Sequence, residues 1–208
     1  MKGTSHAAIG AATGFVAANY VQGTPSETVF LVVLGSISGL IPDLDIDGKL
    51  RGKITLSHKM IQLSAQLIGC MMIIYSFMEK TAVDTWYGAG AGLLIIIIAS
   101  YIKQKHMLTI TGIATLVGGI SIEERWLILL GVYVVVASFT SHRSYTHSLL
   151  GVLFFGMIAS DLETSLGIHG IFIACIGGYI SHLIADMKVL PFNKRGIKLF
   201  LPLSSKEI

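Results

Sequence analysis

Histidine and aspartate residues recur at the ends of the apolar segments of this chain. They fall in segments that are distant from one another in the sequence: His6; Asp43 and Asp45; His142 and His147; His182 and Asp186. Imidazole nitrogen and carboxylate oxygen atoms are both ligands of divalent transition metals, and histidine is also a general base near neutral pH. If these segment ends meet at one depth, the pattern indicates a metal site assembled from helix ends.

The last of these pairs has a helical spacing. His182 and Asp186 are four residues apart, so a helix places both side chains on one face, where they could bind the same ion. The alternative is a hydrogen-bonded pair near the end of a helix. Asp43 and Asp45 follow Pro42, which disfavours helix at the residue before it, so we expect them in an irregular turn. Their alternative is a solvated acidic loop.

The stretch Ser141-His142-Arg143-Ser144-Tyr145-Thr146-His147-Ser148 is dense in reactive side chains. Its two histidines are five residues apart, roughly 140° around an ideal helix, so both could face one ion only if a turn intervenes. Thr146 could cap the helix that follows. Arg143 keeps its proton and would suit an anionic substrate. The alternative places the histidines at the membrane interface, with Arg143 as a cytoplasmic anchor.

The remaining histidines serve as comparisons. His58 and His106 lie in basic stretches, beside Lys59 and after Lys105, which is typical of solvated residues or of residues that contact lipid headgroups. His169 lies near the opposite boundary of its segment. We expect it to be unrelated to the site.

The donor set restricts the metal. Mixed histidine and carboxylate ligands suit zinc first, with manganese or iron as alternatives, whereas magnesium and calcium prefer shells made of oxygen alone. A divalent ion of this kind activates water for ester hydrolysis. Cys70 and Cys175 both lie inside apolar segments, so they support neither a disulfide framework nor a cysteine-based zinc site.

The elements that must position these residues are apolar. The chain has 208 residues, of which 53% are hydrophobic and 13% charged, with a mean hydropathy of +0.74. In a typical soluble domain roughly a quarter of the residues are charged. The much lower fraction here indicates that water is not the main solvent of this chain. We predict an all-α fold, a polytopic transmembrane bundle within a single membrane domain over residues 1–208. The apolar runs predict six to eight helices. The eight candidate segments are 6–22, 27–42, 60–78, 85–102, 107–121, 125–140, 146–160 and 167–187.

Two compositional features bear on how these helices form and pack. Glycine is abundant, at 23 residues, and much of it lies within the apolar segments, as at Gly35, Gly39 and Gly178. Small residues let membrane helices approach closely, which predicts a compact bundle. The alternative is that glycine is simply tolerated in these membrane segments and has no role in packing. The stretches 95–98 and 132–137 are rich in β-branched residues, which favour strands in water. In lipid, however, the backbone N–H and C=O groups must form their hydrogen bonds within the segment itself, and this favours a helix.

The placement of charges orients the bundle. If the N-terminus is cytoplasmic, all but two of the 15 basic residues fall in cytoplasmic segments, the exceptions being Lys80 and Arg125. Because lysine and arginine prefer cytoplasmic loops, we expect both termini, and the site, at the cytoplasmic face of a bacterial inner membrane. We expect no cleaved signal peptide, because the first segment lacks a convincing small-residue cleavage site. The net charge of +3 is scattered over loops, so we expect membrane lipids and not nucleic acid as partners.

Several motifs stand in order along the first, second, seventh and eighth predicted helices and the C-terminal tail: Thr4-Ser5-His6, Pro42-Asp43-Leu44-Asp45, His142-Arg143-Ser144-Tyr145-Thr146-His147-Ser148, Ser181-His182-Leu183-Ile184-Ala185-Asp186 and Gly196-Ile197-Lys198-Leu199-Phe200-Leu201-Pro202. This set resembles the YdjM-like family of bacterial inner-membrane metal-dependent hydrolases. The family places its second and third motifs closer together, so helices 3 to 6, about residues 60–140, look like an insertion. Many relatives have histidine after the second aspartate, where this chain has Ile46 and Asp47, and Asp47 could substitute for it.

More distantly, the order His, Asp, His and His-x-x-x-Asp is similar to that of zinc phospholipase C and P1-type nucleases, which hydrolyse phosphoesters with clustered zinc ions. This likeness implies a ligand set: His6, Asp45, His147, His182 and Asp186, with Asp43 and His142 as further ligands or as residues that orient them. It also implies that Arg143 holds a phosphate. We predict that Arg143, His142 and Asp43 take part in catalysis.

The sequence leaves functions of different classes open. The leading hypothesis is a metal-dependent hydrolase at the cytoplasmic membrane face that acts on a phosphoester, with a lipid as a candidate substrate. A metal-ion or proton transporter could use the same residues, but it predicts ionisable residues near mid-membrane, and the helix interiors are almost free of charge. A non-catalytic membrane scaffold would use the histidines and aspartates only to rigidify helix ends.

Overall fold

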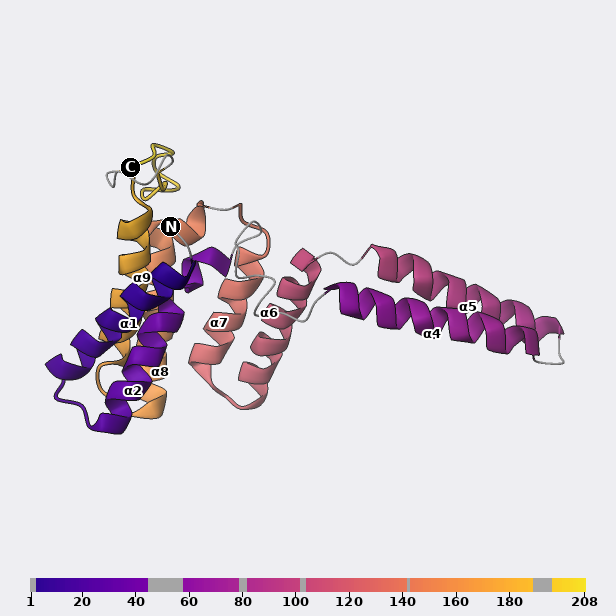
Figure 1. The fold of residues 1–208 in the computed structure, drawn as a ribbon, viewed down its shortest axis with the longest axis horizontal. Helices are drawn as coiled ribbons and strands as arrows, with labels where there is room; N and C mark the ends of the chain where they lie inside the picture. Colours follow the sequence, from indigo (N-terminus) through magenta and orange to yellow (C-terminus); the bar gives the residue numbers. More distant parts are fainter. Residues whose placement is uncertain (1–2, 45–57, 79–81, 102–103, 142, 189–195) are drawn as a thin grey trace. The chain divides into compact units, whose positions relative to one another are not determined.

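The computed structural model describes residues 3–44, 58–78, 82–101, 104–141, 143–188 and 196–208. Within these ranges the chain forms helices and short 3-10 turns and no strand, so the all-α prediction is confirmed. The described residues form eight α-helices (Figure 1): α1 Gly3–Tyr20, α2 Pro25–Ser38, α4 His58–Met78, α5 Ala82–Ser100, α6 Gln104–Ser121, α7 Arg125–Ala137, α8 Leu149–Leu166 and α9 Ile171–Asp186. Each helix overlaps one of the predicted segments. The 3-10 turns are η1, Ile41–Leu44, and η2, Tyr145–His147.

Local sequence explains where α2 begins. Thr24 is its N-cap and forms a capping box with Glu27, in which the Thr24 backbone N–H donates to the Glu27 carboxylate at 2.7 Å. The Glu27 backbone N–H in turn donates to the Thr24 hydroxyl at 3.4 Å. Pro25 occupies the first turn, where its missing N–H costs nothing. These contacts satisfy backbone donors that would otherwise be unpaired at the helix start.

The start of α8 differs from the sequence prediction. Thr146 lies within η2, and Ser148 is the N-cap of α8, accepting from the Gly151 backbone N–H at 3.4 Å. The helix also extends beyond the predicted residue 160 to Leu166, where Gly167 ends it with a φ of 65°. A left-handed residue of this kind favours glycine, which has no Cβ to clash with the carbonyl.

The chain divides into two compact units, Met1–Arg51 with Leu108–Ile208, and Gly52–Met107. In the second unit α4 and α5 pack side by side (Figure 1). A Cβ added to Gly92 would lie 2.6 Å from the Gly69 carbonyl oxygen, so the two helices approach at backbone distance there. The predicted insertion of about residues 60–140 covers this hairpin together with α6 and α7, and its origin as an insertion stays a prediction.

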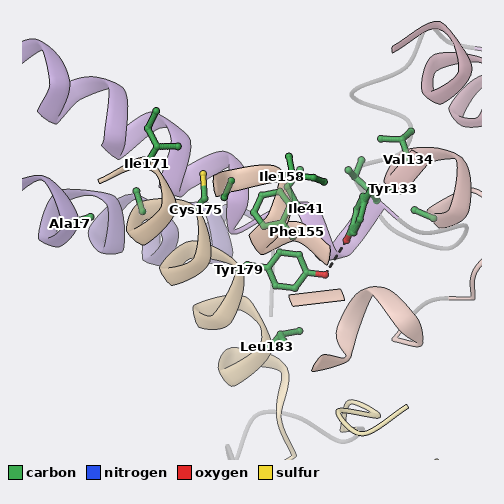
Figure 2. Packing of buried hydrophobic residues seen from close by; sticks show 14 of the residues in the cluster. Ala17, Ile41, Tyr133, Val134, Phe155, Ile158, Ile171, Cys175, Tyr179 and Leu183 are labelled. Carbon is green, nitrogen blue, oxygen red and sulfur yellow. Dashed lines mark hydrogen bonds between the residues drawn. The ribbon is translucent and has the colours of Figure 1, made fainter. Parts of the chain in front are cut away.

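In the first unit α9 is the central helix and packs against α1, α2 and α8. Figure 2 shows the apolar interior along it, where the ring of Tyr179 stacks on Phe155 with centroids 5.1 Å apart. The Tyr179 hydroxyl lies 3.0 Å from that of Tyr133 on α7. α8 bridges α9 and α7, and α7 continues the packing to α6, where Gly131 adjoins Leu116.

Glycines bring α1, α2 and α9 into backbone contact. A Cβ on Gly39 would lie 2.7 Å from the His6 carbonyl oxygen, and one on Gly178 would overlap the Gly35 carbonyl. Gly10 and Gly35 face each other in the same way. Small residues that let helix backbones approach this closely are typical of helix contacts within membranes.

The described residues support membrane residence to different degrees. By length and composition, α8 is the one described helix that could cross a membrane, with 18 residues and a mean hydropathy of 1.5. The described parts of α2, α4, α5, α6, α7 and α9 include shorter apolar stretches. Large apolar side chains are exposed on several of these helices, for example Val29, Ile74 and Leu153. The polytopic arrangement itself stays a prediction.

Replacement of Gly35 by alanine should force apart α1 and α2. The added Cβ would overlap the Gly10 carbonyl and lie 2.9 Å from Gly14 backbone atoms. We expect a destabilisation of about 1–3 kcal/mol, measured as a lower melting temperature of detergent-purified protein. Gly90→Ala in α5 is the matched control, because beyond the backbone of its own helix no atom lies within 4 Å of the new Cβ, and alanine is the better helix former. An equal loss in both variants would contradict the prediction.

Candidate metal centre

The fold brings together side chains that lie far apart in the sequence. They come from the start of α1, from both 3-10 turns and from the end of α9, and all are buried: His6, Asp43, His147, His182 and Asp186. Their donor atoms form two groups, His6 with His182 and Asp186, and Asp43 with His147 and His182. Within each group the donor atoms lie within 4.8 Å of one another.

His182 is the member that both groups share. Its Nδ1 lies 2.7 Å from the Gly39 carbonyl oxygen, which can only accept, so Nδ1 carries the proton and donates it. The Nε2 lone pair is therefore directed toward the cluster. Nε2 lies 3.2 Å from His147 Nε2, 3.7 Å from an Asp43 oxygen and 3.9 Å from an Asp186 oxygen. A backbone carbonyl that fixes the tautomer of a histidine is a common feature of metal-binding sites.

The other imidazoles point inward in the same way. His6 Nε2 lies 3.4 Å from an Asp186 oxygen, and its ring stacks on His182 with centroids 3.9 Å apart. His147 Nε2 lies 3.8 Å from an Asp43 oxygen, and its Nδ1 lies 3.2 Å from the Thr146 hydroxyl. Each imidazole therefore presents Nε2 to a carboxylate.

The shortest of these distances between donor atoms is that of neighbouring donors around a tetrahedral transition metal. Tetrahedral bonds of about 2.0–2.1 Å to nitrogen put neighbouring donors roughly 3.3 Å apart, close to the 3.2 Å between His147 and His182. The 3.9 Å between His182 and Asp186 is too long for the hydrogen-bonded pair that the sequence left open as an alternative. Because Nε2 has a single lone pair, His182 can bind one ion at a time. A second ion would need further ligands.

Local structure explains how the two turns reach α9. The Asp43 backbone N–H donates to the Leu40 carbonyl at 3.1 Å, which folds η1 directly after α2 and places the Asp43 carboxylate beside α9. η1 in turn contacts η2, which carries His147. The prediction of an irregular turn at Asp43 agrees with this short 3-10 turn.

Sequence reasoning missed a tyrosine pair that fixes η2. The Tyr179 hydroxyl donates to the Thr146 carbonyl, so its contact with Tyr133 requires the Tyr133 hydroxyl to donate in turn. Tyr179 lies three residues before His182, on the same face of α9. The spacing Tyr179, His182 and Asp186 on one helix face was therefore readable from the sequence, but its partner in η2 was not.

Arg143 lies at the edge of the cluster. Its Nη2 lies 3.2 Å from an Asp186 oxygen, and 23% of its side chain is exposed. Its backbone has a φ of 60°, a conformation that costs a non-glycine residue about 1–3 kcal/mol. A strained residue beside buried polar groups is typical of a functional site.

The remaining predicted residues are placed as follows. Asp45 and His142 lie outside the described residues, as does the side chain of His58. His106 is exposed on α6. His169 precedes α9, its side chain is 93% exposed, and its Nδ1 lies 3.9 Å from Glu163. His169 is not part of the cluster and can therefore serve as a control for substitutions of the cluster histidines.

Fold and cluster together define an all-helical protein with buried histidines and carboxylates gathered at its helix ends. The chain belongs to the YdjM inner membrane protein family, whose model matches residues 1–208. The match confirms the resemblance to this family and the location in the inner membrane. The hydrolase activity, the number of crossings and the orientation stay predictions. No curated protein and no solved structure matches the chain at a significant level.

Tyr179→Phe should weaken the cluster without removing a ligand. The Thr146 carbonyl loses its donor, and a broken buried hydrogen bond of this kind costs about 1–3 kcal/mol. We expect about a tenfold lower affinity for zinc, because η2 no longer holds His147 in place. Tyr101→Phe, at a 72% exposed position, is the control. Equal zinc affinities in the two variants, measured by competition with a chelating dye, would show that the tyrosine pair does not position His147.

Proposed function

We propose that this protein is a metal-dependent hydrolase of phosphoesters at the cytoplasmic face of a bacterial inner membrane. The observation that carries the proposal is that donor atoms of buried imidazoles and carboxylates from α1, η1, η2 and α9 gather in two groups that share His182, with the donor atoms of each group within 4.8 Å of one another. Burying two carboxylates away from water is costly unless cations or hydrogen-bond donors compensate them. A divalent cation would balance both charges.

The chain's own residues would hold the metal: His6, Asp43, Asp45, His147, His182 and Asp186, with His142 as a further ligand or as a residue that orients them. Zinc is the first candidate, and manganese or iron are alternatives, because nitrogen and oxygen donors are mixed. When bound, the ion supplies Lewis acidity and lowers the pKa of water toward neutrality.

Arg143 would bind the phosphoryl group of the substrate. The guanidinium keeps its charge, and its planar N–H donors match the oxygens of a phosphate. Its partial exposure means that an anion entering from water meets Arg143 before the buried ligands. An Asp43 oxygen would hold the attacking water by a hydrogen bond and accept its proton, with His142 as the predicted partner in this role.

The family places the chain in the inner membrane, and charge placement supports the proposed orientation. His6 lies near the start of α1, whereas Gly39 follows α2 and Asp186 ends α9, so these helix ends share one side. An even number of crossings with both termini on that side accounts for this arrangement. The basic residues after α9, such as Lys188 and Lys198, favour the cytoplasm for it.

Metal content is the first test of the proposal. Detergent-purified wild type should contain stoichiometric zinc, manganese or iron by elemental analysis. His147→Ala and Asp186→Ala each remove a buried donor, so their affinity should fall about 10- to 100-fold or more. His169→Ala should keep the metal, because that side chain is exposed and distant from the cluster.

The opposite outcomes are equally informative. Wild type without stoichiometric metal, even after supplementation with zinc or manganese, would overturn the hydrolase mechanism and favour the scaffold. Metal flux into sealed vesicles that depends on His147 would favour the transporter instead.

Arg143→Asn should separate metal binding from hydrolysis. Asparagine tolerates the left-handed backbone of this position, so the substitution removes the guanidinium without adding strain. We expect the metal content to stay at the wild-type level and kcat/KM for a chromogenic phosphodiester to fall about 100-fold. Arg143→Lys should recover little, because an ammonium does not reproduce the planar fork. Unchanged hydrolysis in Arg143→Asn would remove Arg143 from the mechanism.

A further inference from the structure

A groove of about 600 Å³ lies between α1 and α9, the helices that carry His6, His182 and Asp186. Its α1 wall runs from Ile9 to Tyr20, and its α9 wall includes Ile173 and Gly177. Small residues line part of the groove, and α9 approaches α1 closely there: a Cβ on Gly177 would lie only 3.3 Å from Thr13.

The walls of the groove are apolar. Thr13 is a polar residue among them, but its hydroxyl donates to the Gly10 carbonyl within α1 at 2.7 Å. Ile9 and Val16 are exposed along the groove. The groove therefore suits an apolar occupant that needs no hydrogen bonds.

The groove starts close to the candidate metal centre along α1. His6, Ile9 and Thr13 are spaced by three and four residues, so they lie on one face of α1. The groove begins one helical turn beyond His6 and then follows this face away from the cluster. A molecule with a polar end at His6 could therefore extend its apolar end along α1.

The length of the groove matches half of a membrane. At a rise of 1.5 Å per residue, the wall from Ile9 to Tyr20 is ~16 Å long. The hydrocarbon core of a bilayer is ~30 Å thick, so one leaflet contributes ~15 Å. The groove has the depth that an acyl chain occupies when its headgroup lies at the membrane face.

We infer that the groove receives an acyl chain of an anionic phospholipid, whose phosphate lies at the histidine–aspartate cluster beside Arg143. This inference rests on the proposed function for the reaction, and it narrows the substrate class from phosphoesters in general to membrane phospholipids. The headgroup end meets the cation Arg143 and the candidate metal ligands, and the apolar end meets the α1–α9 groove.

The binding step can be tested without any catalysis. The full chain is placed in nanodiscs that contain a phosphatidylglycerol with a photoactivatable diazirine in one acyl chain, and labelled peptides are mapped by mass spectrometry. We expect label to concentrate on residues 9–20 of α1 and 173–177 of α9. Ala12→Phe and Val16→Trp fill the groove from exposed positions, and they should each lower this labelling about tenfold, because several methylene contacts are lost.

The matched control is Ala91→Phe, the same substitution at an exposed position of α5. It should leave the labelling unchanged. Label spread evenly over exposed apolar positions, or groove labelling that survives both filling variants, would overturn the inference. So would a dimer that the filling variants dissociate while lipid labelling stays constant, because a second copy would then be the occupant.

A hydrolysis assay separates this inference from the proposed function. Long-chain and short-chain phosphoesters with the same headgroup are compared in wild type and Ala12→Phe. We expect Ala12→Phe to raise KM about tenfold for the long-chain ester alone. Groove labelling without hydrolysis of either ester would support the lipid site and overturn the hydrolase proposal. Equal hydrolysis of both esters in both proteins, without groove labelling, would support the hydrolase and overturn the groove inference.

Discussion

The backbone approach of α1, α2 and α9 is the constraint on which the other features depend. Gly10, Gly35 and Gly178 allow the three helices to touch at their backbones, and the end of α2 thereby reaches the face of α9. The Gly39 carbonyl then accepts the Nδ1 proton of His182, and this single hydrogen bond turns Nε2 toward the cluster. A side chain at these glycines would separate the elements that supply the donors, whatever the donors themselves were.

Burial of the two carboxylates strengthens the electrostatic interactions on which the proposed chemistry depends. Asp43 and Asp186 are buried, where an uncompensated carboxylate is far more costly than in water. Arg143 and the imidazoles surround them at distances of 3.2 to 3.9 Å, in an environment that strengthens every electrostatic contact. The same conditions favour binding of a cation and recognition of an anion, so one arrangement serves both parts of the proposed reaction.

Packing and function use the same property of the helices, namely small side chains. Glycine on α9 makes close contact with α2 at Gly178, whereas one residue earlier, at Gly177, it lines the groove beside α1. Tyr179 then occupies the interior and holds η2 through the Thr146 carbonyl. Three consecutive positions of α9 therefore serve helix contact, a hollow surface and the orientation of His147, because successive helical residues point about 100° apart.

The sequence by itself determined the helices, since lipid and hydrophobic runs leave few alternatives for the backbone, and each described helix overlaps a predicted segment. It also identified His6, Asp43, His147, His182 and Asp186 as candidates through residue type and position at helix ends. It did not determine the cap at Ser148 or the η2 contact of Tyr179, and it left open a hydrogen-bonded pair of His182 with Asp186. Only the tertiary structure decided these points, because each depends on how closely helices distant in the sequence approach in space.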